Sequence, residues 1–157
     1  MDNNVDISEK SSIIKNINSE TEVTDVHYIG KIHKEMYNLV AENEIISDDV
    51  IITESRIQHI IERRGKDFYN KYSDCFAEII ASPDYIFKDK NKNTAIVSKQ
   101  FVREQSSINI VLRMIVEGEN VNYKNSIITA IGESDKRFAQ RLRNNKYVYK
   151  KNLDNNE

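Results

Sequence analysis

Residues 107–116, SINIVLRMIV, form the clearest strand in the sequence. Apolar side chains recur there at every second position, which is the period of a β-strand with one face in the core. Residues 85–88 and 94–102 show the same period upstream, and residues 125–131 show it downstream. The stretch from residue 84 to 131 has no room for a crossover helix, so consecutive strands are expected to pair antiparallel.

Helices are expected on both sides of this run of strands. Thr53 is a candidate N-cap for a helix over residues 54–64, and a longer helix is expected over residues 67–81. A basic helix follows the strands, from residue 134 to about 144, before a last short strand over residues 146–150. We therefore predict an α+β fold in which N-terminal helices pack on an antiparallel sheet of about four to five strands, with a basic helix before the last strand.

The apolar pattern divides the chain into one domain and two polar ends. Residues 1–24 are rich in Asn, Ser and Glu, so a flexible polar arm is expected there. Residues 25–151 are expected to form a single domain, and residues 152–157 a disordered tail. A chain of 157 residues suits one ordinary domain.

Composition argues against several classes of protein. The chain has only four glycines and one proline, too few for collagen-like or Pro/Gly-rich disordered proteins. No apolar run approaches the roughly 18 residues of a membrane span, and the start, MDNNVDISEK, lacks the pattern of a secretory signal. The single cysteine, Cys75, cannot form an internal disulfide or a cysteine-based zinc site. We expect a cytoplasmic protein with no membrane partner.

Charge is distributed unevenly along the chain. Residues 1–50 carry four Lys or Arg against eleven Asp or Glu, whereas residues 51–157 carry nineteen against fourteen. Such asymmetry indicates nucleic-acid contact by the basic half. The basic block, residues 136–151, has seven Lys or Arg and no acid. It could follow an RNA backbone, with Arg141 and Lys150 among its contacts, or it could be only a solvated surface.

The helix expected over residues 54–64 carries a histidine between two arginines. Arg56, His59 and Arg63 lie three and four residues apart, so they share the side opposite the apolar stripe. Repulsion from two cations favours a neutral imidazole, which can accept a proton, and the arginines could hold an anion beside it. The alternative is an ordinary polar helix face that contains a histidine.

Two expected strands carry polar groups that could contact an anion. Arg113 interrupts the apolar strand quoted above, where a lone arginine either pairs with an acid or binds an anion. In the next strand, YKNSIIT, Lys124 and Ser126 share one face, and Asn125 and Thr129 share the other. These groups could bind phosphate oxygens, or they could be ordinary polar groups at the start of a strand.

Five segments together resemble a known group of nuclease domains. In order, they are IITESRIQHIIERR, SPDYIFKDKNKNTAIV, INIVLRMIV, YKNSIITA and KRFAQRLRNNKYVYKK. Their order and spacing, over about residues 26–151, resemble the phage barnase–EndoU–colicin–RelE group. The resemblance implies helices packed on an antiparallel sheet and RNA cleavage without a metal, usually by toxins or phage-associated effectors.

The resemblance also implies roles for individual residues. His59 matches the helix histidine of the family, Arg113 matches the arginine of its central strand, and residues 124–126 match its strand signature. Members often end the first helix with Arg-His, where this chain has Arg63 and Arg64. Attack of the RNA 2′-hydroxyl would give a 2′,3′-cyclic phosphate, with a histidine moving the proton and cations stabilising the phosphate.

The predicted site is the sum of these observations. The predicted catalytic residues are His59, Arg113, Lys124, Ser126 and Thr129, and the predicted substrate-binding residues are Arg56, Arg63, Asn125, Arg141, Tyr149 and Lys150. No metal and no cofactor are expected. The expected partners are RNA, for which tRNA is one candidate, and a cognate inhibitor or immunity protein. Two alternatives stay open: a catalytically eroded RNA- or protein-binding module, and a phage structural accessory with an acidic arm for a basic partner.

Overall fold

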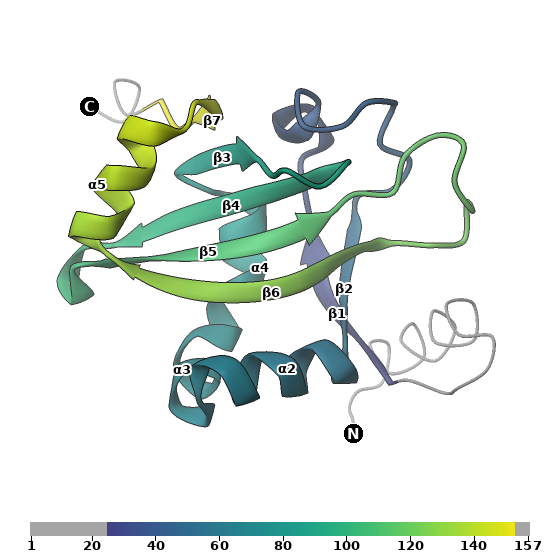
Figure 1. Ribbon diagram of the computed structural model, residues 1–157. Helices are drawn as coiled ribbons and strands as arrows, with labels where there is room; N and C mark the ends of the chain where they lie inside the picture. The colour runs from purple at the N-terminus through teal and green to yellow at the C-terminus, as the bar shows by residue number, and fades with distance from the viewer. Residues whose placement is uncertain (1–24, 153–157) are drawn as a thin grey trace.

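The computed structural model describes residues 25–152, which form a sheet with helices on both faces (Figure 1). The strands are β1 (Val26–Lys31), β2 (Asp49–Thr53), β3 (Tyr85–Lys88), β4 (Thr94–Phe101), β5 (Ser106–Arg113), β6 (Asn125–Ser134) and β7 (Tyr147–Lys150). The α-helices are α2 (Glu54–Arg64), α3 (Lys66–Tyr72), α4 (Phe76–Ala81) and α5 (Asp135–Asn144), and the short 3-10 helices are η1 (Lys34–Tyr37), η2 (Ser73–Cys75) and η3 (Val102–Glu104).

The predicted α+β class is confirmed, but the sheet is larger than expected and mixed. Seven strands lie in the order β1-β2-β6-β5-β4-β3-β7. All neighbours are antiparallel except β2 and β6, which run parallel with Val50 opposite Asn125 and Ile51 opposite Ser126. β1 and β2 also precede α2, α3 and α4 along the chain. The expectation of four to five antiparallel strands is therefore wrong in number and in the direction of this pair.

The helix α2 begins and ends where its sequence predicts. The Thr53 side chain accepts a hydrogen bond from the Arg56 backbone N–H at 3.2 Å, and Gly65, with φ of 100°, follows the last residue of α2. The single helix expected over residues 67–81 is instead interrupted by η2, where Ser, Asp and Cys are weak helix formers.

The two faces of the sheet are covered differently. One face packs on α2, α3 and α4, and Figure 1 shows α4 behind the central strands. On the other face, α5 covers one end of the sheet, where buried Phe138 contacts the rings of Tyr85 and Phe87. The rest of this second face, over β5 and β6, is not covered by a helix in Figure 1. We call this region the open face.

A bulge in β6 decides which side chains reach the open face. Leu112 is opposite Ile127 and Val111 is opposite Thr129, so Ile128 is an extra residue in β6. Thr129 consequently shares the face of Ser126, while Asn125 lies on the buried side. The prediction that Asn125 and Thr129 share a face is therefore wrong.

The expected polar arm, residues 1–24, lies outside the described residues, as do residues 153–157 of the expected tail. Within the described part of the chain, no helix combines the length and the apolar character needed to cross a membrane.

Candidate functional site

A cavity of about 260 Å³ brings together three of the predicted site residues from two distant segments. Arg56 comes from α2, Lys124 precedes β6, and Ser126 lies within β6. The other lining residues are Ile51, Thr53, Ile115, Tyr123 and Ile127. The cavity thus combines two cationic groups and three hydroxyl-bearing side chains with apolar walls, which suits an anion attached to an apolar or aromatic body.

The polar side of α2 borders this cavity. Arg56 lines it, and His59 and Arg63 follow at one-turn intervals, with about 5–6 Å expected between successive Cβ atoms. All three side chains are exposed, and within residues 25–152 none of them makes a side-chain hydrogen bond or ion pair. Buried Ile57 and Ile60 fix the helix from its other side. The predicted Arg–His–Arg face is therefore available to a ligand.

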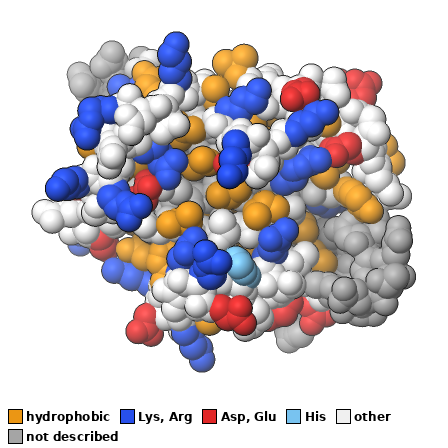
Figure 2. All heavy atoms as spheres, viewed as in Figure 1, with side chains coloured by type: hydrophobic (Ala, Val, Ile, Leu, Met, Phe, Trp, Pro, Cys, Tyr) orange, Lys and Arg blue, Asp and Glu red, His pale blue; other side chains and the backbone are white. Residues whose placement is uncertain are grey.

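Figure 2 shows the surrounding surface from the side of the open face. Lys and Arg side chains surround apolar side chains near its centre, and acidic side chains are interspersed among them. Such a surface can hold a phosphate backbone at its cations while it offers apolar area to a base.

Arg113 reaches the same face but already has an acidic partner. It lies opposite Ser126 in the sheet register. Its guanidinium donates to both carboxylate oxygens of Glu119, at 3.1 and 2.6 Å, and also to the Met114 carbonyl. This hydrogen bond from Arg113 lowers the pKa of Glu119. Of the two roles that the sequence left open, the structure favours the ion pair.

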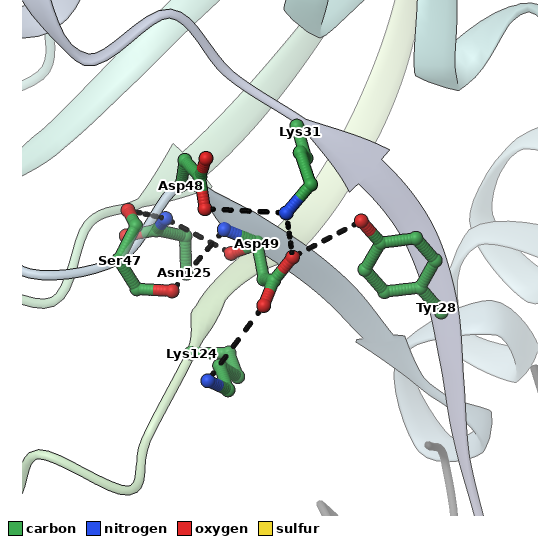
Figure 3. Close-up of polar contacts among 7 residues, drawn as sticks. All are labelled: Tyr28, Lys31, Ser47, Asp48, Asp49, Lys124 and Asn125. Carbon is green, nitrogen blue, oxygen red and sulfur yellow. Dashed lines mark hydrogen bonds and ion pairs between the residues drawn. The ribbon is translucent and has the colours of Figure 1, made fainter. Parts of the chain in front are cut away.

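Lys124 belongs to a polar cluster that the sequence did not predict (Figure 3). Its Nζ lies 3.7 Å from Oδ2 of Asp49. The Tyr28 hydroxyl and the Lys31 ammonium donate to Oδ1 of Asp49 at 3.0 and 2.9 Å. The hydrogen bond to Asp49 raises the pKa of Lys31, and burial followed by the same carboxylate raises the pKa of Tyr28. These groups come from β1, β2 and the segment before β6, which are far apart in the sequence. The cluster can therefore be recognised only when the pairing of the strands is known.

Asn125 has a structural role instead of the predicted contact with substrate. Its side chain is fully buried. The amide donates to the carbonyls of Ser47 and Asp49 at 2.6 and 2.9 Å, and its oxygen accepts from the Ile115 N–H at 2.8 Å. The bond to Asp49 joins the parallel strands β2 and β6, and the other two bonds connect Asn125 to the segments before β2 and after β5. The predicted substrate contact of Asn125 is therefore corrected to a structural one.

Thr129 lies next to Val111 on the open face, on the rung beyond Ser126. Its hydroxyl oxygen is buried and has no hydrogen-bond partner in the described structure. An unsatisfied buried hydroxyl has a free-energy cost, and the predicted role of Thr129 as a donor to substrate stays a prediction.

The substrate residues predicted near the C-terminus lie away from the cavity. β7 is separated from β6 by β5, β4 and β3, which amounts to four strand spacings or roughly 19 Å. Lys150 is exposed on β7, and Tyr149 packs against the core. Arg141 donates to both carboxylate oxygens of Glu133, at 3.1 and 2.8 Å. The structure therefore does not join these three residues to Arg56 and Lys124.

Sequence reasoning also missed a contact at the edge of β6. Arg64 donates from Nε to the Ala130 carbonyl at 3.3 Å. β2 pairs with β6 only at residues 125 and 126, so α2 and this arginine cover part of the remaining edge. Among residues 25–152, no three His, Cys, Asp or Glu side chains are grouped so as to hold a metal ion.

Comparison with known proteins gives one match. A family model described as phage-Barnase-EndoU-ColicinE5/D-RelE like nuclease 2 matches residues 16–150. Neither the curated proteins nor the solved structures give a match. The match covers most of the chain and both sides of the cavity, and it confirms the resemblance seen in the sequence. The chain belongs to the phage-Barnase-EndoU-ColicinE5/D-RelE-like nuclease 2 family.

Proposed function

We propose that this protein is a metal-independent endoribonuclease. The RNA 2′-oxygen would attack the adjacent phosphorus, the bond from phosphorus to the 5′-oxygen would break, and a 2′,3′-cyclic phosphate would remain. The family supports a nuclease. The observation that carries the proposal is the cavity lined by Arg56, Lys124 and Ser126, with His59 one helical turn from Arg56.

In this proposal His59 moves the proton. The imidazole accepts the proton of the 2′-hydroxyl, and either the resulting imidazolium or solvent water supplies a proton to the leaving 5′-oxygen. Proton transfer by a positioned side chain contributes roughly 100- to 10,000-fold to a rate. His59 is exposed, so an RNA strand can reach it without rearrangement of the helix.

The cations act on the phosphate. Arg56, from α2, and Lys124, from the segment before β6, line one cavity, and the Ser126 hydroxyl that also lines it is a further donor to a phosphate oxygen. Negative charge grows on these oxygens in the transition state, so fixed cations lower its free energy more than that of the bound substrate. Arg63 extends the same side of α2 and would contact the next phosphate.

The test is incubation with total RNA and with a DNA oligonucleotide, both in EDTA. We expect RNA to be cut, DNA to resist because it lacks the 2′-hydroxyl, and the new ends to carry 2′,3′-cyclic phosphates. His59→Ala is the matched inactive control. Activity that is lost on chelation and restored by magnesium would contradict the mechanism, as would cleavage of DNA.

Two observations favour a second candidate, a binding module that has lost catalysis. Arg113 is held by Glu119, and the position at which family members often have a second histidine is occupied here by Arg64, which donates to a backbone carbonyl. Such a module would bind RNA or a protein without cutting RNA.

If the protein is a phage- or mobile-element-associated toxin, it should harm a cell that expresses it, and His59→Ala should remove the toxicity.

A further inference from the structure

Asp49 is a nearly buried acid at the start of β2, and its side chain is only 13% exposed. Cationic or hydroxyl groups approach it from two sides: Tyr28 and Lys31 from β1, and Lys124 from the segment before β6 (Figure 3). Burial of a carboxylate is costly unless its partners repay the lost hydration. The cluster therefore needs an explanation, and Lys124 links it to the cavity.

The two oxygens of Asp49 have different partners. Oδ1 accepts hydrogen bonds from Tyr28 and Lys31 at 3.0 and 2.9 Å, which fixes the plane of the carboxylate. Oδ2 then lies 3.7 Å from the Lys124 nitrogen. That distance is too long for a hydrogen bond but short enough for strong attraction. The ammonium is held in place while its N–H groups are not used by the carboxylate.

The backbone keeps this arrangement in register. Because Val50 pairs with Asn125 and Ile51 with Ser126, Asp49 and Lys124 stand side by side at the start of two parallel strands. Alternation along each strand then directs Asp49 and Lys124 to the same face as Ile51 and Ser126, both of which line the cavity. The Asn125 amide, bonded to the Asp49 carbonyl at 2.9 Å, fixes the two chains to each other.

We propose that Asp49 is a positioning residue, which holds the Lys124 ammonium at the cavity for a phosphate group of RNA. A free lysine side chain has many rotamers, and the guanidinium of Arg56, which lines the same cavity, would repel its charge. A fixed carboxylate behind Lys124 opposes both effects. This inference rests on the proposed function, because the anion in question is the RNA phosphate.

Neutralising Asp49 should change RNA affinity in opposite directions if Asp49 positions Lys124 and if it acts only through its own charge. This difference makes the inference testable. Asp49 is itself negative, so its charge alone repels a phosphate, and neutralisation alone would strengthen binding. If Asp49 positions Lys124, neutralisation weakens binding instead. The loss should vanish when Lys124 is absent, and only the relief of repulsion should remain.

The experiment measures dissociation constants of the full chain for a 2′-O-methyl RNA oligonucleotide, which cannot be cut because its 2′-oxygen cannot attack. Asp49→Asn should weaken binding at least threefold. In the Lys124→Gln background the same change should leave binding unchanged or strengthen it. Asp48→Asn is the matched control, since Asp48 contacts Lys31 at 3.4 Å and forms no ion pair with Lys124 in the described structure; it should not weaken binding.

The inference would be overturned by stronger binding of Asp49→Asn with Lys124 present, by an equal loss in both backgrounds, or by no binding of the oligonucleotide by the unaltered chain. If Asp49→Asn fails to fold, Tyr28→Phe removes one hydrogen bond to Oδ1, and its smaller loss must likewise disappear with Lys124→Gln. An equal loss from Tyr28→Phe in both backgrounds would overturn the inference too. Binding without cleavage of unmodified RNA would contradict only the ribonuclease proposal.

Discussion

Arg113 and Glu119 form a two-contact ion pair that closes the loop after β5. The guanidinium donates to the two carboxylate oxygens at 3.1 and 2.6 Å, and Glu119 also accepts the Val116 backbone N–H at 2.9 Å. Each side chain is 31% exposed. The arginine therefore stabilises the loop that carries Ile115, one wall of the cavity.

We expect Arg113→Ala to reduce stability more than catalysis. Loss of charge-assisted hydrogen bonds in a partly exposed pair should lower the free energy of unfolding by about 1–3 kcal/mol. Cleavage per folded molecule should change less than threefold. Denaturant unfolding and initial rates measure the two effects, with exposed Arg103→Ala as the control. A tenfold loss of turnover at unchanged stability would make Arg113 a catalytic cation.

His59→Ala should have the opposite effect. His59 is exposed and has no side-chain partner in the described structure, so its removal should leave the unfolding free energy within about 0.5 kcal/mol of the original. The rate constant at saturating RNA should fall by roughly 100- to 10,000-fold, while the dissociation constant stays the same. His33→Ala is the control, since His33 is exposed beside η1 and does not line the cavity. Equal losses of binding and rate would assign His59 to binding.

Local signals made part of the fold predictable. The Thr53 cap, the isoleucine stripe and Gly65 define α2 within the sequence itself, and the same helical period placed Arg56, His59 and Arg63 on one side. The parallel pairing of β2 with β6 has no such signal, because the two strands are far apart along the chain. The bulge at Ile128 is equally hidden, and it reverses the expected face of Thr129.

The site was predictable in the same uneven way. Residue type and period identified Arg56, His59, Lys124 and Ser126 as candidates, and the fold unites Arg56, Lys124 and Ser126 in one cavity. Ion-pair partners were not predictable, because each depends on tertiary geometry. Arg113 pairs with Glu119 in the loop that follows β5, and Arg141 of α5 pairs with Glu133 of β6. Arg113 and Arg141 are therefore already neutralised by acidic partners, whereas Arg56 and Arg63 form no ion pair within residues 25–152.

The lowered pKa of Glu133 should make the free energy of unfolding depend on pH. Its side chain is 10% exposed and accepts from Asn109 at 2.7 Å as well as from Arg141. Burial raises the pKa of Glu133, but hydrogen bonds from Arg141 and Asn109 outweigh it and leave the pKa below its ordinary value. A carboxyl group with a lowered pKa in the folded state stabilises the protein above its ordinary pKa. That contribution is lost as the pH falls through the folded pKa.

Glu133→Gln should therefore lower the free energy of unfolding by about 3 kcal/mol at neutral pH, because it leaves Arg141 without its charged partner. The difference from the original protein should shrink as the pH falls through the folded pKa of Glu133, where the original side chain also becomes neutral. Urea unfolding at a series of pH values measures this difference. Exposed Glu117→Gln is the control. A difference that does not change with pH would show that packing, and not charge, is responsible.

Variants of the basic block, residues 136–151, test RNA binding separately from catalysis. Arg143 and Lys150 are exposed, whereas Arg141 is held by Glu133. If the block follows the RNA backbone, each phosphate contact releases counterions, and affinity for single-stranded RNA falls with salt at a slope of about −0.7 per contact. Replacing Arg143 and Lys150 with Gln should flatten that slope by roughly 1.4 and weaken binding of all RNA sequences alike. Turnover of saturating RNA should change little, because β7 lies four strand spacings from β6.

The control is Arg141→Gln, which should reduce stability and leave the slope almost unchanged. An unchanged slope in the double variant would mean that the block is only a solvated surface and that RNA is held by the cavity and the polar side of α2 alone.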